Sequence, residues 1–117
     1  MRLTPVIYDT ALPIAGYGPG FFRLGTHVLQ GACLISPWDA GPWGGYVDTA
    51  GPLSLAGRID VLFVGTGAEI AHAPPAFRVL IEAAGMGVEV MNSPAACRTY
   101  NVLLGEGRRV AVALLPV

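Results

Sequence analysis

The stretch Asp60-Val61-Leu62-Phe63-Val64-Gly65-Thr66-Gly67 decides the fold of this chain. Its four consecutive apolar residues, Val61 to Val64, predict a short strand that is buried on both faces of a sheet. The two glycines that follow allow a tight turn and a close approach of the backbone to another group. The Gly-Thr-Gly turn would then lie at the carboxyl end of a central strand, where open α/β sheets usually bind ligands.

The chain after residue 58 alternates between strand and helix patterns. Pro75 and Pro94 suit the first position of a helix, Gly85 and Gly105 suit helix ends, and Ser93 is a good N-cap for the second helix. Strands that are separated by helices imply crossover connections and a largely parallel sheet. We therefore expect strands at residues 60–64, 88–91 and 109–115, and helices at about 75–84 and 94–104.

The first half of the chain differs in composition and is rich in Gly, Pro and aromatic residues. Residues 21–24 and 27–37 are expected to form β segments, joined by a turn at Gly25-Thr26. Residues 36–45 contain too many glycines and prolines for us to expect regular structure. The early strands either extend the sheet or form a second layer. Since no linker or repeat separates the halves, we expect residues 1–117 to form a single α/β domain.

The composition excludes several classes of protein. Charged residues make up 13% of the chain, against about 25% in typical globular domains, and the chain is too apolar to be disordered. Its apolar runs are too short to span a membrane, and its net charge of −1 gives no general attraction for nucleic acid. Because the N-terminus shows no targeting pattern, we expect a cytoplasmic protein. So few charges are also compatible with a homo-oligomer.

The sequence predicts no metal and no cofactor. Its two cysteines and two histidines lack the spacing of a zinc site. The turn at residues 65–67 does not complete a G-x-G-x-x-G dinucleotide fingerprint, because position 70 is Ile. The absence of lysine excludes Schiff-base chemistry and a phosphate-loop lysine. Cys97 falls on the apolar face of a helix, where we expect a buried structural thiol.

Two loops supply the main candidates for a binding site. Asn92-Ser93 follows one central strand and begins a helix, whose N-terminus favours negative charge. If the strands at 60–64 and 88–91 are neighbours, this loop and Gly65-Thr66-Gly67 share one end of the sheet. They would then form a small polar cup for a carboxylate, phosphate or carbonyl group. The alternative is a tight turn beside a Ser93 that only caps its helix.

Further candidates lie beyond these loops. Tyr100 and Asn101 are in the second predicted helix, where Tyr100 either reaches a cleft or packs in the core. Arg108 either clamps an anion or pairs with Glu106 in the preceding turn. His72 is expected to be a surface loop histidine.

The aromatic residues of the first half concentrate in one loop region. Trp38 and Trp43 are close in sequence to further aromatic side chains and lie among glycines and prolines. Aromatic residues in such loops often anchor protein interfaces. The alternative is that they fill the gap between the N-terminal strands and the sheet.

The second half also resembles a known family. The elements Val64-Gly65-Thr66-Gly67, then Gly87-Val88-Glu89-Val90-Met91, and then the run from Ala95 to Val110 with its Thr-Tyr-Asn and Glu-Gly-Arg motifs are similar to a family of small domains of unknown function. That family includes mitochondrial complex I assembly factor 3 and an adipogenesis-associated relative.

The resemblance implies a three-layer α/β domain with a central mixed sheet. Combined with the strand and helix patterns, this predicts a central mixed, largely parallel sheet flanked by helices, plus extra N-terminal β segments. It supplies no catalytic mechanism. The chain departs from the family at Asn92-Ser93, where the family more often has Asp-Thr, and an Asn cannot act there as an acid or base.

These observations favour a non-catalytic binding or assembly-factor-like module, whose partner is another protein, at a respiratory or membrane-associated complex. The alternative is a small-ligand or anion-binding enzyme. Its cleft would be built from the residues that form our candidate site, which are Gly65, Thr66, Gly67, Asn92, Ser93, Tyr100, Asn101 and Arg108.

Overall fold

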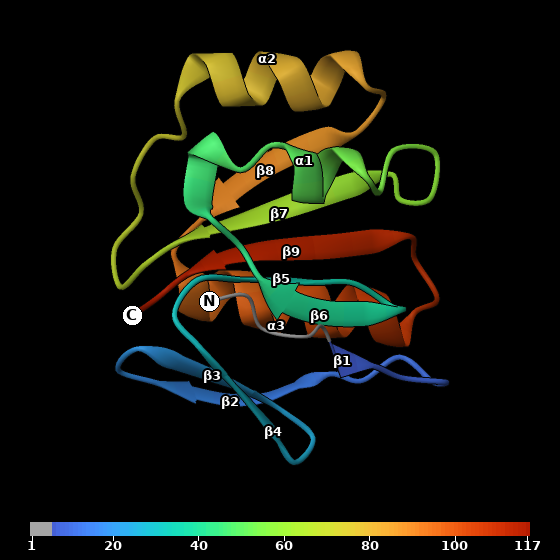
Figure 1. The fold of residues 1–117 in the computed structure, drawn as a ribbon, viewed down its shortest axis with the longest axis vertical. Coiled ribbons are helices and arrows are strands. Elements are labelled where there is room, and N and C mark those ends of the chain that lie inside the picture. Colours follow the sequence, from blue (N-terminus) through green and yellow to red (C-terminus); the bar gives the residue numbers. More distant parts are fainter. Residues whose placement is uncertain (1–5) are drawn as a thin grey trace.

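A six-stranded mixed sheet forms the centre of the molecule, with helices on both of its faces (Figure 1). The structure is a computed structural model and describes residues 6–117. The strand order in the sheet is β1-β6-β5-β9-β7-β8, and a second, three-stranded antiparallel sheet has the order β2-β3-β4. The strands are β1 (Val6–Ile7), β2 (Ile14–Gly18), β3 (Phe21–Leu24), β4 (His27–Gln30), β5 (Cys33–Ile35), β6 (Asp39–Pro42), β7 (Val61–Thr66), β8 (Gly87–Met91) and β9 (Val110–Leu115).

The three strands expected from the second half are confirmed. β7 pairs in parallel with both β8 and β9, with Val61 opposite Gly87 on one side and Val110 on the other. β7 extends two residues further than expected and includes Gly65 and Thr66, so the turn begins at Gly67. The sheet is mixed because β5 joins the far side of β9 in the antiparallel direction.

The two faces of β9 show how the sheet builds two separate apolar layers. Val110, Val112 and Leu114 pack with α3 (Ser93–Gly105) and the second sheet. Ala111 and Ala113 face the opposite layer, which contains the buried side of α2 (Pro75–Ala83). A strand that is buried on both faces must be apolar at every position, and this explains the unbroken run from Val110 to Leu115.

The two long helices lie where the sequence places them, with two local corrections. In α2, Phe77 and Ile81 are buried, but Leu80 is 42% exposed rather than part of the buried face. In α3, the N-cap is Asn92 and not Ser93, because the Asn92 Oδ1 accepts a hydrogen bond from the Ala95 amide at 2.8 Å. Ser93 is instead the first helical residue, which leaves its hydroxyl free for contacts beyond the helix.

Both of the arrangements expected for the N-terminal strands occur in the structure. β5, β6 and β1 extend the main sheet, whereas β2 to β4 form the second layer beside α3 (Figure 1). The expectation of no regular structure at residues 36–45 is wrong. That segment contains β6, which pairs with β5 and β1, and it leads into the short helices η1 (Gly45–Val47) and α1 (Ala50–Leu53).

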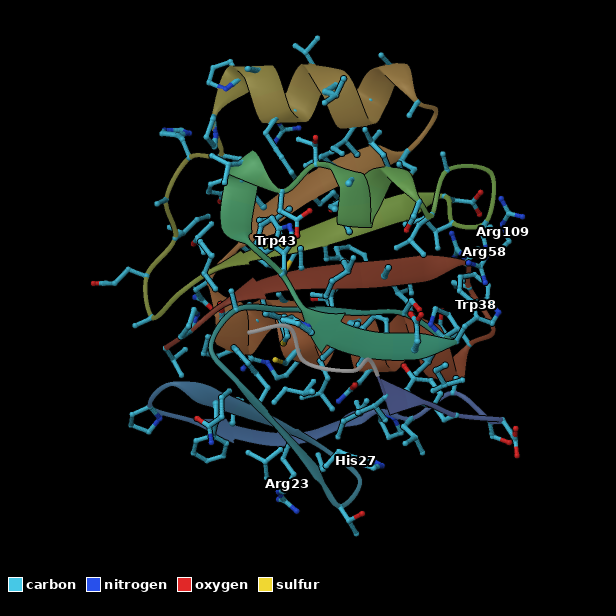
Figure 2. The ribbon with its side chains drawn as sticks, viewed as in Figure 1. Arg23, His27, Trp38, Trp43, Arg58 and Arg109 are labelled. Atoms are coloured by element: carbon cyan, nitrogen blue, oxygen red, sulfur yellow. The ribbon has the colours of Figure 1, made fainter. Side chains whose placement is uncertain are left out.

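The two tryptophans have different roles. Trp43 is buried and contacts the rings of Tyr46 and Phe77, at centroid distances of 5.6 and 6.0 Å, so it fills the space between α2 and the sheet. Trp38 is 36% exposed, and the Arg58 guanidinium stacks over its ring at 4.0 Å (Figure 2). Trp43 therefore fills a gap, as one alternative expected, but the gap lies under α2 and not between the N-terminal strands and the sheet. Within residues 6–117, every helix is too short or too polar to cross a membrane.

Candidate functional site

The two candidate loops meet at the carboxyl ends of the parallel strands. The Ser93 amide donates a hydrogen bond to the Gly67 carbonyl at 2.8 Å, and the Gly67 amide donates one to the Ser93 Oγ at 2.9 Å. The Ser93 hydroxyl donates in turn to the Leu115 carbonyl at 2.6 Å. One serine thereby joins the end of β9 to the turn that follows β7 and the helix that follows β8.

This junction is filled by protein atoms. A Cβ atom added to Gly65 would lie 2.7 Å from the Ser93 Oγ and 2.7 Å from the Leu114 Cδ2, both too close for any real contact. Ser93 itself is fully buried. Gly65 is therefore glycine because α3 begins directly against the strand, and this close approach leaves no room for a ligand between them.

The hydroxyl of Thr66 shapes the loop that follows. Its Oγ1 donates to the Glu69 carbonyl at 2.7 Å and accepts a hydrogen bond from the Ala71 amide at 3.1 Å. The Met91 carbonyl lies 3.3 Å away as an alternative acceptor. These bonds, and the cap by Asn92, occupy most of the polar groups that we expected to bind a ligand. The two loops therefore lie together as expected, and the hydrogen bonds of their polar groups go to other atoms of the chain.

Tyr100 and Asn101 are not part of this junction. Tyr100 is fully buried in the apolar layer around α3, and its hydroxyl has no hydrogen-bond partner among the described residues. Burial raises the pKa of this phenol far above its usual value, with a smaller contribution from Tyr8. Asn101 binds the backbone of Ile14 twice, accepting from its amide at 2.8 Å and donating to its carbonyl at 2.9 Å. This amide attaches α3 to the second sheet.

Arg108 lies at the opposite end of the sheet. Because β9 is parallel to β7, the residues that precede Val110 lie beside the start of β7 and far from Gly67. Arg108 and Glu106 are both exposed, and the ion pair at this end joins Arg109 to Asp60 at 3.1 Å. The direction of β9 thus separates Arg108 from the other candidate residues.

An open cleft of about 320 Å³ lies beside the junction, and sequence reasoning missed it. The Thr66-anchored loop supplies one wall, and Arg78 of α2 and Val90 of β8 supply the other. His72, which we expected to be a surface loop residue, is exposed and also lines the cleft. The signal in the sequence was weak, since only the position of this loop after a central strand pointed to it. The full lining is Ile70, Ala71, His72, Ala73, Arg78 and Val90.

The thiols of Cys33 and Cys97 lie in the core and do not line this cleft. Burial, with a smaller effect of the nearby Cys97, raises the pKa of Cys33 to about 12. Burial also raises the pKa of Cys97 to about 11, against a smaller opposing effect of Arg98. Because the reactive form of a cysteine is the thiolate, both side chains are chemically inert at neutral pH. Within residues 6–117, no three His, Cys, Asp or Glu side chains lie close enough together to bind a metal ion.

Comparison with known sequences gives a family. Residues 14–115 match the family model described as protein of unknown function (DUF498/DUF598). The chain is 52% identical over 107 residues to an uncharacterized protein of Rhodobacter capsulatus, covering 92% of this chain and 86% of that one. It is 33% identical to the mouse protein named NADH dehydrogenase [ubiquinone] 1 alpha subcomplex assembly factor 3, covering 93% of this chain. The match spans 63% of the mouse protein's length.

Solved structures share the same fold. A crystal structure described as an outer membrane protein from Bartonella henselae superimposes with a TM-score of 0.83 at 32% identity, covering 92% of this chain and 97% of the other. A solution structure of a Bordetella pertussis protein, described as a Mth938-like domain, gives a TM-score of 0.76 at 28% identity, covering 99% and 92% of the two chains. These likenesses support the mixed sheet flanked by helices, with its separate antiparallel sheet.

Proposed function

This chain belongs to the family of proteins of unknown function DUF498/DUF598, and we propose that it is a non-catalytic binding module that assists the assembly of a larger protein complex. The observation that carries the proposal is the closed junction at Gly67, Ser93 and Leu115. The polar groups that suggested a ligand site in the sequence are used to hold the ends of three elements together. Because these groups bond to the chain's own backbone, we expect the protein to bind its partner through other parts of its surface.

The names of the relatives indicate which complex to test first. The mouse relative is named as an assembly factor of NADH dehydrogenase, and several vertebrate relatives carry the same name at 29–36% identity. We propose that this chain acts, from the cytoplasm, on a respiratory or membrane-associated complex. Its identity to these proteins is modest and it matches about three fifths of their length, so the partner is an inference from the shared module.

The test is the assembly state of the NADH dehydrogenase complex in cells that lack this chain. Membranes from a deletion strain are separated on native gels and stained for NADH oxidation. We expect a smaller amount of the full-size complex and an accumulation of smaller subcomplexes, both reversed when the gene is supplied again. An unchanged amount of full-size complex in the deletion strain would contradict the proposal.

The alternative function is a small-ligand or anion-binding enzyme at the same edge of the sheet. The specific observation in its favour is the cleft of about 320 Å³ beside the Gly67 junction, at a position where α/β folds often bind ligands. Binding of inorganic phosphate or acetate at millimolar concentration, followed by NMR at His72 and Arg78, would support it. We prefer the binding module because the groups that line the cleft include no nucleophile paired with a base.

A further inference from the structure

The cleft beside β8 opens onto the free edge of the main sheet. Among residues 6–117, β8 pairs with β7 and with no other strand. The Gly87 amide donates toward the start of β7, to the Asp60 carbonyl at 2.8 Å. Since backbone groups alternate between the two sides of a strand, the amide and carbonyl groups of Val88 and Val90 point outward from the sheet. β8 therefore presents backbone groups that an added strand can pair with.

Part of this edge is already covered. The Nη1 of Arg78 reaches from α2 and donates a hydrogen bond to the outward carbonyl of Val88 at 3.0 Å. Covering an edge strand with a neighbouring helix is a common protection against indiscriminate pairing, and here a charged side chain of α2 provides the cover. Val90 lies two residues further along, where the neighbouring surface is the cleft. The chain thus blocks the first outward position of β8 and leaves the second position beside an open cleft.

The side chains of the cleft define the chemistry of an occupant. Ile70, Ala71, Ala73 and Val90 make its lining mainly apolar, and Ile70 is 68% exposed. The ionisable residues that line it are both basic, His72 and Arg78. Their neighbour Glu82 pairs with the Nη1 of Arg78 at 3.3 Å, and within the described residues the Nη2 and Nε atoms have no acceptor. Two donors of a guanidinium remain available for a carboxylate.

We propose that the cleft binds an extended peptide segment of a partner protein that carries a carboxylate, and that this segment adds as a strand to β8 beside Val90. Main-chain hydrogen bonds to the edge supply affinity, and an apolar side chain in the cleft with a carboxylate at Arg78 and His72 supplies selectivity. This inference rests on the proposed function, because it names the kind of partner segment that the binding module takes.

The test is a selection of random heptapeptides with free C-termini on the full chain. The selected peptides are then measured against the double variant His72→Gln, Arg78→Gln, which removes the Arg78 charge and the His72 imidazole and keeps side chains that form hydrogen bonds. The matched control is His27→Gln, Arg23→Gln, which makes the same two changes on exposed residues of the second sheet (Figure 2). We expect at least a tenfold loss of affinity in the cleft variant and no change in the control.

A second measurement tests the geometry of binding. A selected peptide is prepared in two versions, each N-methylated at one of its two sets of alternate residues, because only one set of amides faces β8. We expect one version to lose binding and the other to keep it. Amide signals of residues 70–73 and 90 should shift when the unmodified peptide is added. The proposal is overturned if no peptide is selected, if the cleft variant binds as well as the wild-type chain, or if N-methylation has no effect. The proposal is also overturned if the chain forms a dimer whose amide signals shift at the same edge, because the occupant is then a second copy of this chain.

The outcome separates this inference from the proposed function. If the cleft variant restores complex assembly as well as the wild-type chain does, the cleft proposal fails and the assembly role stands. If the deletion strain assembles the complex normally, the assembly role fails whatever the peptides show.

Discussion

The hydroxyl of Ser93 is the acceptor for the amide of Gly67, 26 positions earlier in the chain, and the two backbones exchange a second bond at 2.8 Å. This reciprocal contact fixes the start of α3 against the end of β7. The same hydroxyl donates to Leu115, so a single buried side chain holds three parallel strands at their common end.

The first prediction concerns Ser93→Ala. The change removes the acceptor of the buried Gly67 amide and the donor to the half-buried Leu115 carbonyl. We expect the free energy of unfolding in urea to fall by about 2–3 kcal/mol. The control is Ser54→Ala, because Ser54 also donates to a backbone carbonyl but is exposed, and its loss should cost less than about 0.5 kcal/mol. Equal effects of the two variants would contradict the structural role of Ser93.

A second prediction compares two strand glycines. In Gly65→Ala, the new methyl group would lie 2.7 Å from Ser93 Oγ and must displace α3 or Leu114, so we expect a loss of about 1–3 kcal/mol. In Gly87→Ala, the nearest atoms lie 3.6 Å from the new methyl group, which is an ordinary contact. Because Gly87 is exposed, we expect the free energy of unfolding to change by less than about 0.5 kcal/mol. Thermal unfolding of both variants checks this difference. A Gly65→Ala protein as stable as wild type would show that the junction is looser than the structure indicates.

The third prediction concerns the attachment of the second sheet. Asn101→Ala removes both hydrogen bonds to Ile14, and we expect a stability loss of about 2 kcal/mol. Hydrogen exchange should become faster in β2 to β4, while β7 and β9 keep their protection. Uniformly faster exchange over the whole chain would instead show that the two sheets unfold as one unit.

A fourth prediction concerns the unpartnered phenol. Tyr100→Phe removes a buried hydroxyl that has no hydrogen-bond partner among the described residues. We therefore expect unchanged or slightly higher stability, by at most about 1 kcal/mol. A loss of more than 1 kcal/mol, which is about the value of one hydrogen bond, would reveal a partner such as an ordered water.

The fifth prediction is a loss of stability at high pH. The pKa of Cys33 is raised to about 12 and that of Cys97 to about 11, so the folded chain keeps these protons where the unfolded chain releases them. Stability should be unaffected below the ordinary cysteine pKa and should fall as the pH rises from about 9 to 11, by at most about 1.4 kcal/mol per pH unit for each thiol. Cys33→Ala should make this decline less steep. An identical slope in the variant would assign the decline to other groups.

The sequence predicted the second half of the fold well because its signals are local. Proline and glycine at the ends of α2 and α3, and unbroken apolar runs in β7 and β9, act on their own neighbourhood. The N-cap was displaced by one residue because Asn92 and Ser93 are equally good caps, and a contact to Gly67 decided between them. No local rule includes a partner 26 residues away.

The candidate site was harder to predict for the same reason. The shared end of the strands followed from the crossover helices, so Gly67 and Ser93 were correctly placed together. Whether Arg108 lay near them could not be decided from the sequence, because the direction of β9 depends on pairing across the sheet. β6 was missed because its short run, Asp39–Pro42, is strand only through its pairing with β5 and β1.

The most direct test of the binding role is photo-crosslinking in living cells from an unnatural amino acid at position 70. Ile70 is exposed beside the cleft, and Val102, which is 60% exposed on α3, serves as the control position. We predict a crosslink from position 70 to one defined protein, a subunit or assembly intermediate of a respiratory complex, and none from position 102. The absence of any protein crosslink from either position would contradict the account.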